Sequence, residues 1–175
     1  MEKLLSVQPS DTVEIVYTSG TTGDPKGVVL THKNIVSNIL GACSHISLPK
    51  FFSFLSVLPL SHMFEQTVGF LIPLYRGDKI IYLRTIKPSS IMEALSKENI
   101  SSMLVVPKFL LLLKNTIERE LASKNLQVFL RIGLLRKAIS PFIRKKFGRQ
   151  FKMFITGGAA LPLDVFTFWR EMGIK

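Results

Sequence analysis

The stretch YTSGTTGDPKG (residues 17–27) gathers the side chains of this sequence that are best suited to holding an anion. It follows a β-branched, apolar run, and it consists of glycine, serine and threonine around a turn, with Lys26 near its end. Such a loop offers closely spaced backbone N–H groups and hydroxyl donors, and its small side chains let an anion reach the backbone. The lysine adds a positive charge. We therefore expect this stretch to bind a polyphosphate.

Two common phosphate-binding patterns do not fit the stretch. The Walker pattern fails because Pro25 occupies the fifth position after Gly20 and because Lys26 is followed by Gly27 rather than serine or threonine. The spacing G-x-G-x-x-G is absent as well. A tight surface turn would explain Gly23-Asp24-Pro25, but it leaves the hydroxyl residues and the lysine around that turn unexplained.

The extended stretch YTSGTTGDPKGVVLTH resembles the phosphate-binding signature of the adenylate-forming enzymes, the superfamily of acyl-CoA synthetases, firefly-type luciferases and adenylation domains. Every position matches Tyr/Phe-Thr-Ser-Gly-Ser/Thr-Thr-Gly-x-Pro-Lys-Gly-Val. The resemblance implies that Lys26 contacts a phosphate of ATP. It also implies that a loop over the β- and γ-phosphates is formed by Thr18, Ser19, Gly20, Thr21, Thr22 and Gly23. Hydroxyls and a lysine suit that chemistry, because negative charge gathers on the departing pyrophosphate.

A second segment, LPLSHMFEQTVGFLIPLYRGDKII (58–81), resembles the family segment in which a Leu-Pro-Leu-x-His strand end leads into an apolar helix beside the acyl site. Its His-x-Phe-Glu form is most similar to long-chain fatty acyl-CoA synthetases. The resemblance implies that His62 lies near the adenylate or the acyl carboxylate; on residue type alone, His62 is a helix N-terminal residue satisfied by backbone. We interpret Glu65 as a partner of the helix dipole and not as a catalytic residue.

A third segment, FITGGAALP (154–162), resembles the family segment that forms the floor beneath adenine and the acyl chain. The resemblance implies this role for Gly157, Gly158 and Ala159, whose small size lets a flat base or an alkyl chain approach the backbone. An ordinary strand-to-helix turn would also satisfy the segment. The order of the three segments favours the family.

Apolar strands alternate with helical stretches along the whole chain. We expect strands over 12–17, 27–30, 52–60, 79–83 and 102–106, a strand followed by a loop over 152–158, and helices over 32–46, 63–77, 88–100, 108–123, 126–147 and from 162 onward. Because the strands are apolar throughout rather than alternating, they favour a layered α/β fold with a largely parallel sheet and flanking helices. The 175 residues suffice for one compact unit, and no linker is evident.

Composition excludes several classes of protein. A hydrophobic content of 47% excludes a disordered chain. The longest apolar stretches are interrupted well short of the roughly 18 residues of a spanning helix, and the N-terminus shows no secretory signal. The lone Cys43 cannot form an internal disulfide. We expect a cytoplasmic protein, with peripheral association at a membrane.

The net charge of +11 is concentrated in the segment 124–152, which contains no acidic residue. Its basic residues are Lys124, Arg131, Arg136, Lys137, Arg144, Lys145, Lys146, Arg149 and Lys152. Such a segment suits an anionic membrane surface or a nucleic acid. The alternatives are a solvated helix face, or a face covered by acidic sequence outside this chain. With the family resemblance we expect membrane association and no nucleic acid.

The resemblance covers nearly all of residues 1–175 but only part of a family enzyme. We therefore expect a partial N-terminal domain that lacks its first part, its end and the C-terminal domain. The glutamate that binds Mg²⁺, in a Tyr-Gly-x-Thr-Glu segment, and the catalytic lysine are expected outside this chain, so the chain alone is expected to be inactive and to contain no metal ligand.

The complete enzyme is expected to convert a long-chain fatty acid and ATP into acyl-AMP and pyrophosphate, and then to transfer the acyl group to coenzyme A. Two alternatives keep the adenylation step: an aryl or short-chain CoA ligase, and an adenylation domain that loads a carrier protein. A third is a non-catalytic module that uses the basic segment 124–152 to bind a membrane or a nucleic acid.

Overall fold

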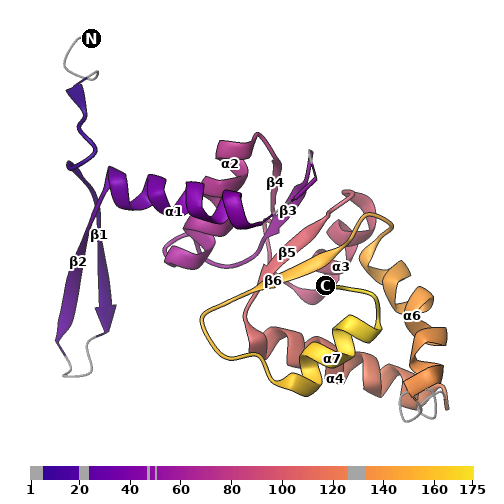
Figure 1. Cartoon of the computed structure of the whole chain (residues 1–175). Coiled ribbons are helices and arrows are strands. Elements are labelled where there is room, and N and C mark those ends of the chain that lie inside the picture. The colour runs from indigo at the N-terminus through magenta and orange to yellow at the C-terminus, as the bar shows by residue number, and fades with distance from the viewer. Residues whose placement is uncertain (1–5, 20–23, 47, 50, 126–132) are drawn as a thin grey trace. The chain divides into compact units, whose positions relative to one another are not determined.

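The computed structural model describes residues 6–19, 24–46, 48–49, 51–125 and 133–175 (Figure 1). The chain divides into two compact units, Met1–Leu48 and Pro49–Lys175, and each is described here by itself. The expectation of a single compact unit is therefore wrong. The division falls in a short connection that carries no glycine-rich or charged run, so composition gave no signal for it.

The first unit contains a hairpin followed by a helix. Strands β1 (Thr12–Ser19) and β2 (Pro25–Thr31) are antiparallel and run from the pair Thr12 and Thr31 to the pair Ser19 and Pro25. Helix α1 (His32–His45) follows at once. Its expected cap is confirmed: the Asn34 backbone N–H donates to the Thr31 hydroxyl (3.2 Å), and the Thr31 N–H donates to the Asn34 side chain (3.0 Å).

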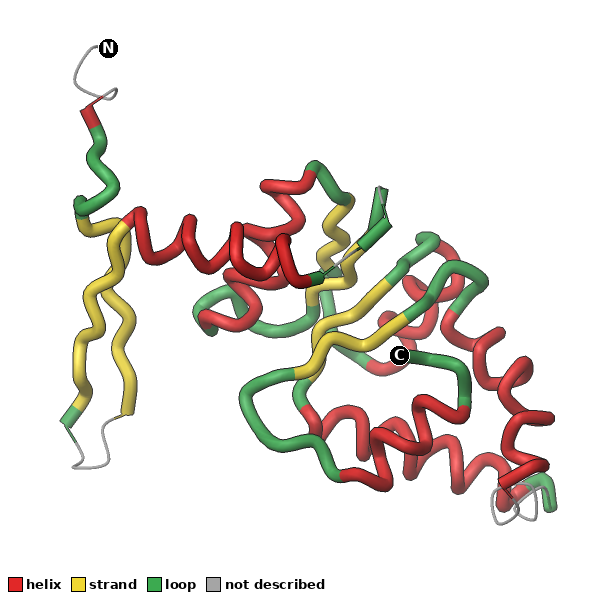
Figure 2. The backbone as a smooth tube through the Cα atoms, viewed as in Figure 1, coloured by secondary structure: helices red, strands yellow, loops and turns green. Residues whose placement is uncertain are grey.

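The expectation that residues 12–17 form a buried strand is wrong with respect to burial. Val13, Ile15 and Tyr17 are 43%, 52% and 73% exposed. Figure 2 shows β1 and β2 as a two-stranded ribbon that continues into α1. Because this sheet has only two strands, the described part of the unit has no second layer to cover it. The β-branched and aromatic side chains favour the extended backbone, but they do not determine whether it is buried.

The second unit contains a four-stranded parallel sheet with the order β4-β3-β5-β6. Its strands are β3 (Ser53–Ser56), β4 (Lys79–Tyr82), β5 (Ser102–Val105) and β6 (Met153–Thr156). Its helices are η2 (Glu65–Leu71), α2 (Ile72–Arg76), α3 (Pro88–Lys97), α4 (Pro107–Ser123), α6 (Gly133–Phe147) and α7 (Leu163–Glu171). The predicted α/β fold with a parallel sheet and flanking helices is confirmed.

Side chains alternate between the two faces of this sheet. Leu55, Met103 and Phe154 are aligned across β3, β5 and β6, and they belong to the main apolar core with residues of α3, α4, α6 and α7. In that core the ring centroids of Phe154 and Trp169 lie 4.9 Å apart. The helix η2 packs against β3 and β5. Among the described residues no helix is long and apolar enough to cross a membrane.

Candidate functional site

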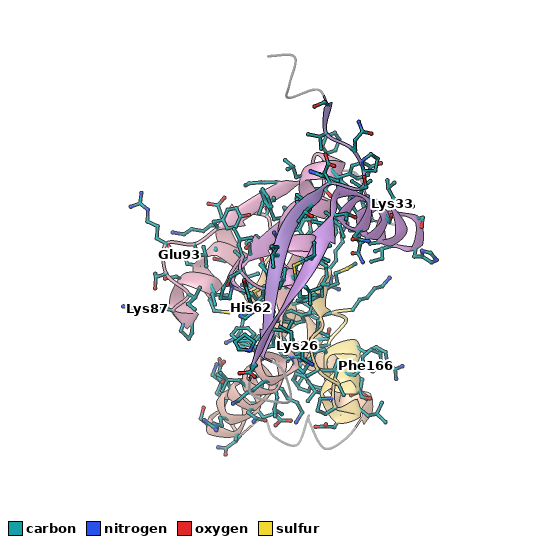
Figure 3. All side chains as sticks on the ribbon, turned by 90° about the vertical axis from the view of Figure 1, so that its left-hand side faces the viewer. Lys26, Lys33, His62, Lys87, Glu93 and Phe166 are labelled. Atoms are coloured by element: carbon teal, nitrogen blue, oxygen red, sulfur yellow. The ribbon has the colours of Figure 1, made fainter. Side chains whose placement is uncertain are left out.

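The hairpin holds the two ends of the predicted phosphate loop. Thr18 and Lys26 are direct partners in the β1–β2 register, and the Thr18 hydroxyl donates to the Lys26 carbonyl oxygen (3.4 Å). Both side chains are exposed, and Figure 3 labels Lys26 on the hairpin. The predicted loop residues Gly20, Thr21, Thr22 and Gly23 lie outside the described residues, and Ser19 is described only as the last residue of β1.

The second and third predicted segments meet at one edge of the parallel sheet. Strands β3 and β6 end at Ser56 and Thr156, and in a parallel sheet these carboxyl ends share an edge, the usual place for ligands in open α/β sheets. A Cβ on Gly157 would lie 2.8 Å from Cε2 of Phe64 and 3.1 Å from its Cζ. The Phe64 ring therefore lies directly on the Gly157 backbone, where any other residue would force it away.

The rest of the third segment is open. Gly158 has a φ of +82°, the left-handed region that favours glycine, and nothing lies within 4 Å of the position a Cβ would take. Ala159 is exposed. The small residues after β6 thus do two things: Gly157 admits the Phe64 ring, while Gly158 and Ala159 leave their backbone uncovered in the described structure.

His62 lies in the turn that enters the helical segment. Its backbone N–H donates to the Pro59 carbonyl (3.0 Å), and its own carbonyl accepts from the Gln66 N–H (3.0 Å). The side chain is exposed (Figure 3). This is the backbone arrangement expected of a helix N-terminal residue, and its imidazole is accessible. The catalytic contribution of His62 stays a prediction.

Sequence reasoning missed the burial of Glu65. Its side chain is completely buried, and neither carboxylate oxygen has a hydrogen-bond partner among the described residues. Burial raises the pKa of Glu65, an effect only partly opposed by the nearby Ser56 hydroxyl and Leu58 backbone. A Cβ on Gly69 would lie 2.3 Å from Oε1 of Glu65. The available signal was a glycine four residues after an acid within a mostly apolar stretch.

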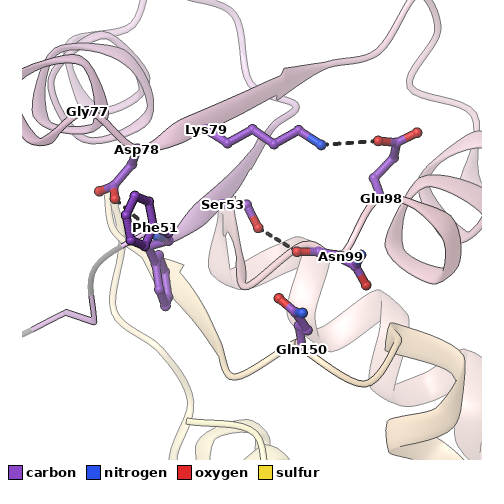
Figure 4. A pocket seen from close by; sticks show the side chains of 9 residues that line it. Phe51, Ser53, Gly77, Asp78, Lys79, Glu98, Asn99 and Gln150 are labelled. Carbon is purple, nitrogen blue, oxygen red and sulfur yellow. Dashed lines mark hydrogen bonds and ion pairs between the residues drawn. The ribbon is translucent and has the colours of Figure 1, made fainter.

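A pocket of about 390 Å³ lies at the other edge of the sheet, where β3 and β4 begin (Figure 4). Several of its polar groups are paired: Lys79 Nζ lies 3.3 Å from the Glu98 carboxylate, and the Ser53 hydroxyl donates to the Asn99 carbonyl (2.6 Å). None of the sequence-predicted site residues lines it. Its charged side chains are in ion pairs, Lys79 with Glu98 and Asp78 with Arg76. Because of this pairing, and because the pocket lies at the amino ends of the strands, we regard it as structural.

Comparison with known proteins agrees with these segments. A family model described as "AMP-binding enzyme" matches residues 2–175. The chain belongs to the AMP-binding enzyme family. Among its relatives, the mitochondrial malonate–CoA ligase ACSF3 of Homo sapiens is 32% identical over 161 residues, and long-chain-fatty-acid–CoA ligase 5 of Rattus norvegicus is 30% identical over 189 residues. These alignments cover 90% and 97% of this chain but only 26% and 28% of the relatives.

Solved structures of the family share the fold. The N-terminal domain of FACL13 from Mycobacterium tuberculosis superimposes with a TM-score of 0.70 at 25% identity, covering 94% of this chain and 35% of that one. The o-succinylbenzoate–CoA synthetase MenE from Bacillus subtilis, in complex with ATP and magnesium ion, gives a TM-score of 0.68 at 20% identity, covering 96% of this chain and 30% of that one. This chain therefore has the fold of part of an adenylate-forming enzyme.

Proposed function

We propose that the protein containing this chain is an ATP-dependent acid–thiol ligase. It joins a fatty acid to AMP with release of pyrophosphate and then transfers the acyl group to coenzyme A. The observation that carries the proposal is the register of the hairpin, which sets Thr18 opposite Lys26 at the two ends of the family's phosphate-binding signature. The long-chain-fatty-acid–CoA ligase at 30% identity supports the reaction class.

The residues of this chain suit ATP with Mg²⁺. Lys26 and the Thr18 hydroxyl would hold the β- and γ-phosphates together with the loop between them, and Gly158 and Ala159 would lie beneath the adenine or the acyl chain. Bound Mg²⁺ would neutralise phosphate charge, through the glutamate that we predict outside this chain. The exposed His62 would lie beside the acyl carboxylate.

The helical segment at the sheet edge favours a monocarboxylic fatty acid over malonate. In Glu65–Leu71 the only ionisable side chain is Glu65, which is completely buried, so this segment offers no cation to a second carboxylate. The segment that follows, from Val68 to Leu74, is apolar and suits an alkyl chain.

The test is ATP–pyrophosphate exchange by the full-length protein with a panel of palmitate, acetate, benzoate, malonate and amino acids. We expect the fastest exchange with palmitate. Lys26→Ala should lower this rate by about 100-fold, the usual effect of losing a charge-stabilising donor. Lys33→Ala, an exposed lysine on α1, is the matched control and should change it little. Exchange with malonate or an amino acid but none with palmitate would refute the fatty-acid assignment.

We also propose that the basic segment 124–152 contacts an anionic membrane. Phe142 on α6 is 45% exposed, and Lys124 Nζ and Lys146 Nζ, which both form ion pairs with Glu120, lie 5.1 and 5.4 Å from its ring centroid. Exposed basic residues continue along the segment at Arg144, Lys145, Arg149 and Lys152. An exposed aromatic ring among cations suits the headgroup region of an anionic bilayer, from which a long-chain fatty acid would be drawn.

A further inference from the structure

We propose that Glu65 and Gly69 act as a positioning pair: the Glu65 carboxyl fills the space left by the missing Gly69 side chain, and this packing holds Phe64 on Gly157 and His62 at the carboxyl edge of the sheet. The packing stands on the structure alone. Its consequence for catalysis rests on the proposed function.

The fit between Glu65 and Gly69 is close. A Cβ on Gly69 would lie 2.3 Å from Oε1, 2.7 Å from Cδ and 3.3 Å from Oε2 of Glu65. Because no part of Glu65 is exposed, its side chain cannot turn outward without displacing its neighbours. Gly69 is itself buried. Alanine at position 69 would therefore have to move either the carboxyl group or the helical turn.

These two residues lie within a π-helical segment, Glu65–Leu71, which continues directly into α2. The backbone is helical on both sides, at Phe64 and Ile72. A π-turn accommodates one extra residue, and one residue rotates the helix by about 100° because an α-helix has about 3.6 residues per turn. Loss of the π-turn would therefore rotate Phe64 relative to α2 and away from Gly157.

Phe64 transmits this geometry to the site because it directly precedes Glu65. Three atoms of its ring lie within 3.2 Å of the position that a Gly157 Cβ would occupy. A shift of the turn would thus move the ring off Gly157 in the third predicted segment. It would also move His62, which lies two residues before Phe64 in the same turn.

Glu65 is a costly way to fill this space. Both of its carboxylate oxygens are buried, and the neighbouring Ser56 hydroxyl and Leu58 backbone offset only part of the cost of that burial. An apolar side chain of similar size would avoid that desolvation. A buried polar group without full compensation next to a predicted site calls for a functional explanation. The explanation that we propose is that the Glu65 carboxyl fills the space beside Gly69 and so fixes the turn.

The experiment is a double-mutant cycle in the full-length protein, with Gly69→Ala, Glu65→Ala and the combined variant. Palmitate-dependent kcat, the KM for ATP and the melting temperature are measured for each. We expect Gly69→Ala to lower kcat by about 10- to 100-fold, as for a misplaced reacting group, with little change in the KM for ATP. In the Glu65→Ala background the added methyl group should cost much less, because the carboxyl it would meet is gone.

Two variants complete the design. Gly41→Ala is the matched control, since a Cβ at Gly41 meets nothing within 4 Å, and it should leave kcat unchanged. Glu65→Gln keeps the shape of the side chain and should retain kcat. This variant also tests the pair if Gly69→Ala fails to fold. Equal losses from Gly69→Ala in both backgrounds, or a Glu65→Gln as impaired as Glu65→Ala, would overturn the proposal. If the unmodified protein lacks ligase activity, the proposed function fails, while the melting-temperature cycle still decides the packing pair.

Discussion

Glu65 gives the second unit a stability that depends on pH. Burial raises its pKa above the ordinary value of 4.5, so the folded state binds the proton more tightly than the unfolded state does. Ionisation of Glu65 then costs folding free energy once the pH rises above 4.5, and the full cost is present above the raised pKa. Tyr82 on β4 faces the same charge, and burial together with the Glu65 charge raises the pKa of its phenol.

Replacing Glu65 by glutamine should therefore stabilise the protein at neutral pH but not in acid. We expect the melting temperature of Glu65→Gln to exceed that of the unmodified full-length protein by a few degrees at pH 8, the usual response to about 1–2 kcal/mol. The difference should shrink as the pH falls toward 4.5, as measured by thermal unfolding at several pH values.

Glu93→Gln is a control of opposite sign. The exposed Glu93 pairs with Lys97 at 2.8 Å, and this partner lowers the pKa of Glu93. Its loss should cause a slight destabilisation that is present above pH 4.5 and disappears in acid. If Glu65→Gln behaved in the same way as Glu93→Gln, Glu65 would not be desolvated in solution.

At the scale of elements, the sequence predicted the positions of strands and helices better than their burial. Pro88 and Pro107 start α3 and α4, and Thr31 caps α1, because proline and hydroxyl residues act through local backbone geometry. The burial of β1 could not be predicted from local sequence, since it depends on whether a second layer from elsewhere in the chain covers the strand. The strand predicted over 52–60 is shorter, Ser53–Ser56, because only these residues pair with β4.

The candidate site was predictable where it follows local motifs and not where it depends on packing. Thr18, Lys26 and Gly157 were named from the family motifs in the sequence, and their roles in binding stay predictions. The contact between Glu65 and Gly69 was not predicted, because their four-residue spacing matters only inside a π-turn, which the hydrophobic periodicity does not reveal. The expected helix over 126–147 is described only from Gly133, and residues 126–132 lie outside the described residues.

The basic segment 124–152 leads to a prediction about membranes. We expect the full-length protein to sediment with vesicles containing phosphatidylserine at low salt and to be released as salt rises, because each cation contributes about 1 kcal/mol near such a surface. The double variant Lys145→Glu/Arg149→Glu should abolish this binding. Lys87→Glu, an exposed lysine outside the segment 124–152, is the control and should preserve it. Binding that is independent of salt, or absent at low salt, would refute the proposal.

At the scale of the molecule, this chain spans about a quarter of the relatives it matches. We predict that residues 1–175 alone form no acyl-CoA from palmitate, ATP and coenzyme A, because the Mg²⁺-binding glutamate and the catalytic lysine are predicted outside them. The hairpin exposes Ile15, Tyr17 and Val29, so we also expect the isolated chain to self-associate. The measurement is thioester formation together with light scattering, and acyl-CoA formed by this piece would contradict the prediction.

In the antiparallel pairing of β1 and β2, the number of residues in the phosphate loop determines on which face of the hairpin the Lys26 side chain lies. Thr18 faces Lys26 only in the observed register, and a slip of one residue in either strand would turn every side chain to the opposite face. An added or deleted residue within β2 would therefore carry Lys26 to the wrong side of the ribbon, even though every residue type of the signature remained. The signature thus depends on the spacing of its residues as much as on their types. We expect insertions there to be tolerated less well than conservative substitutions.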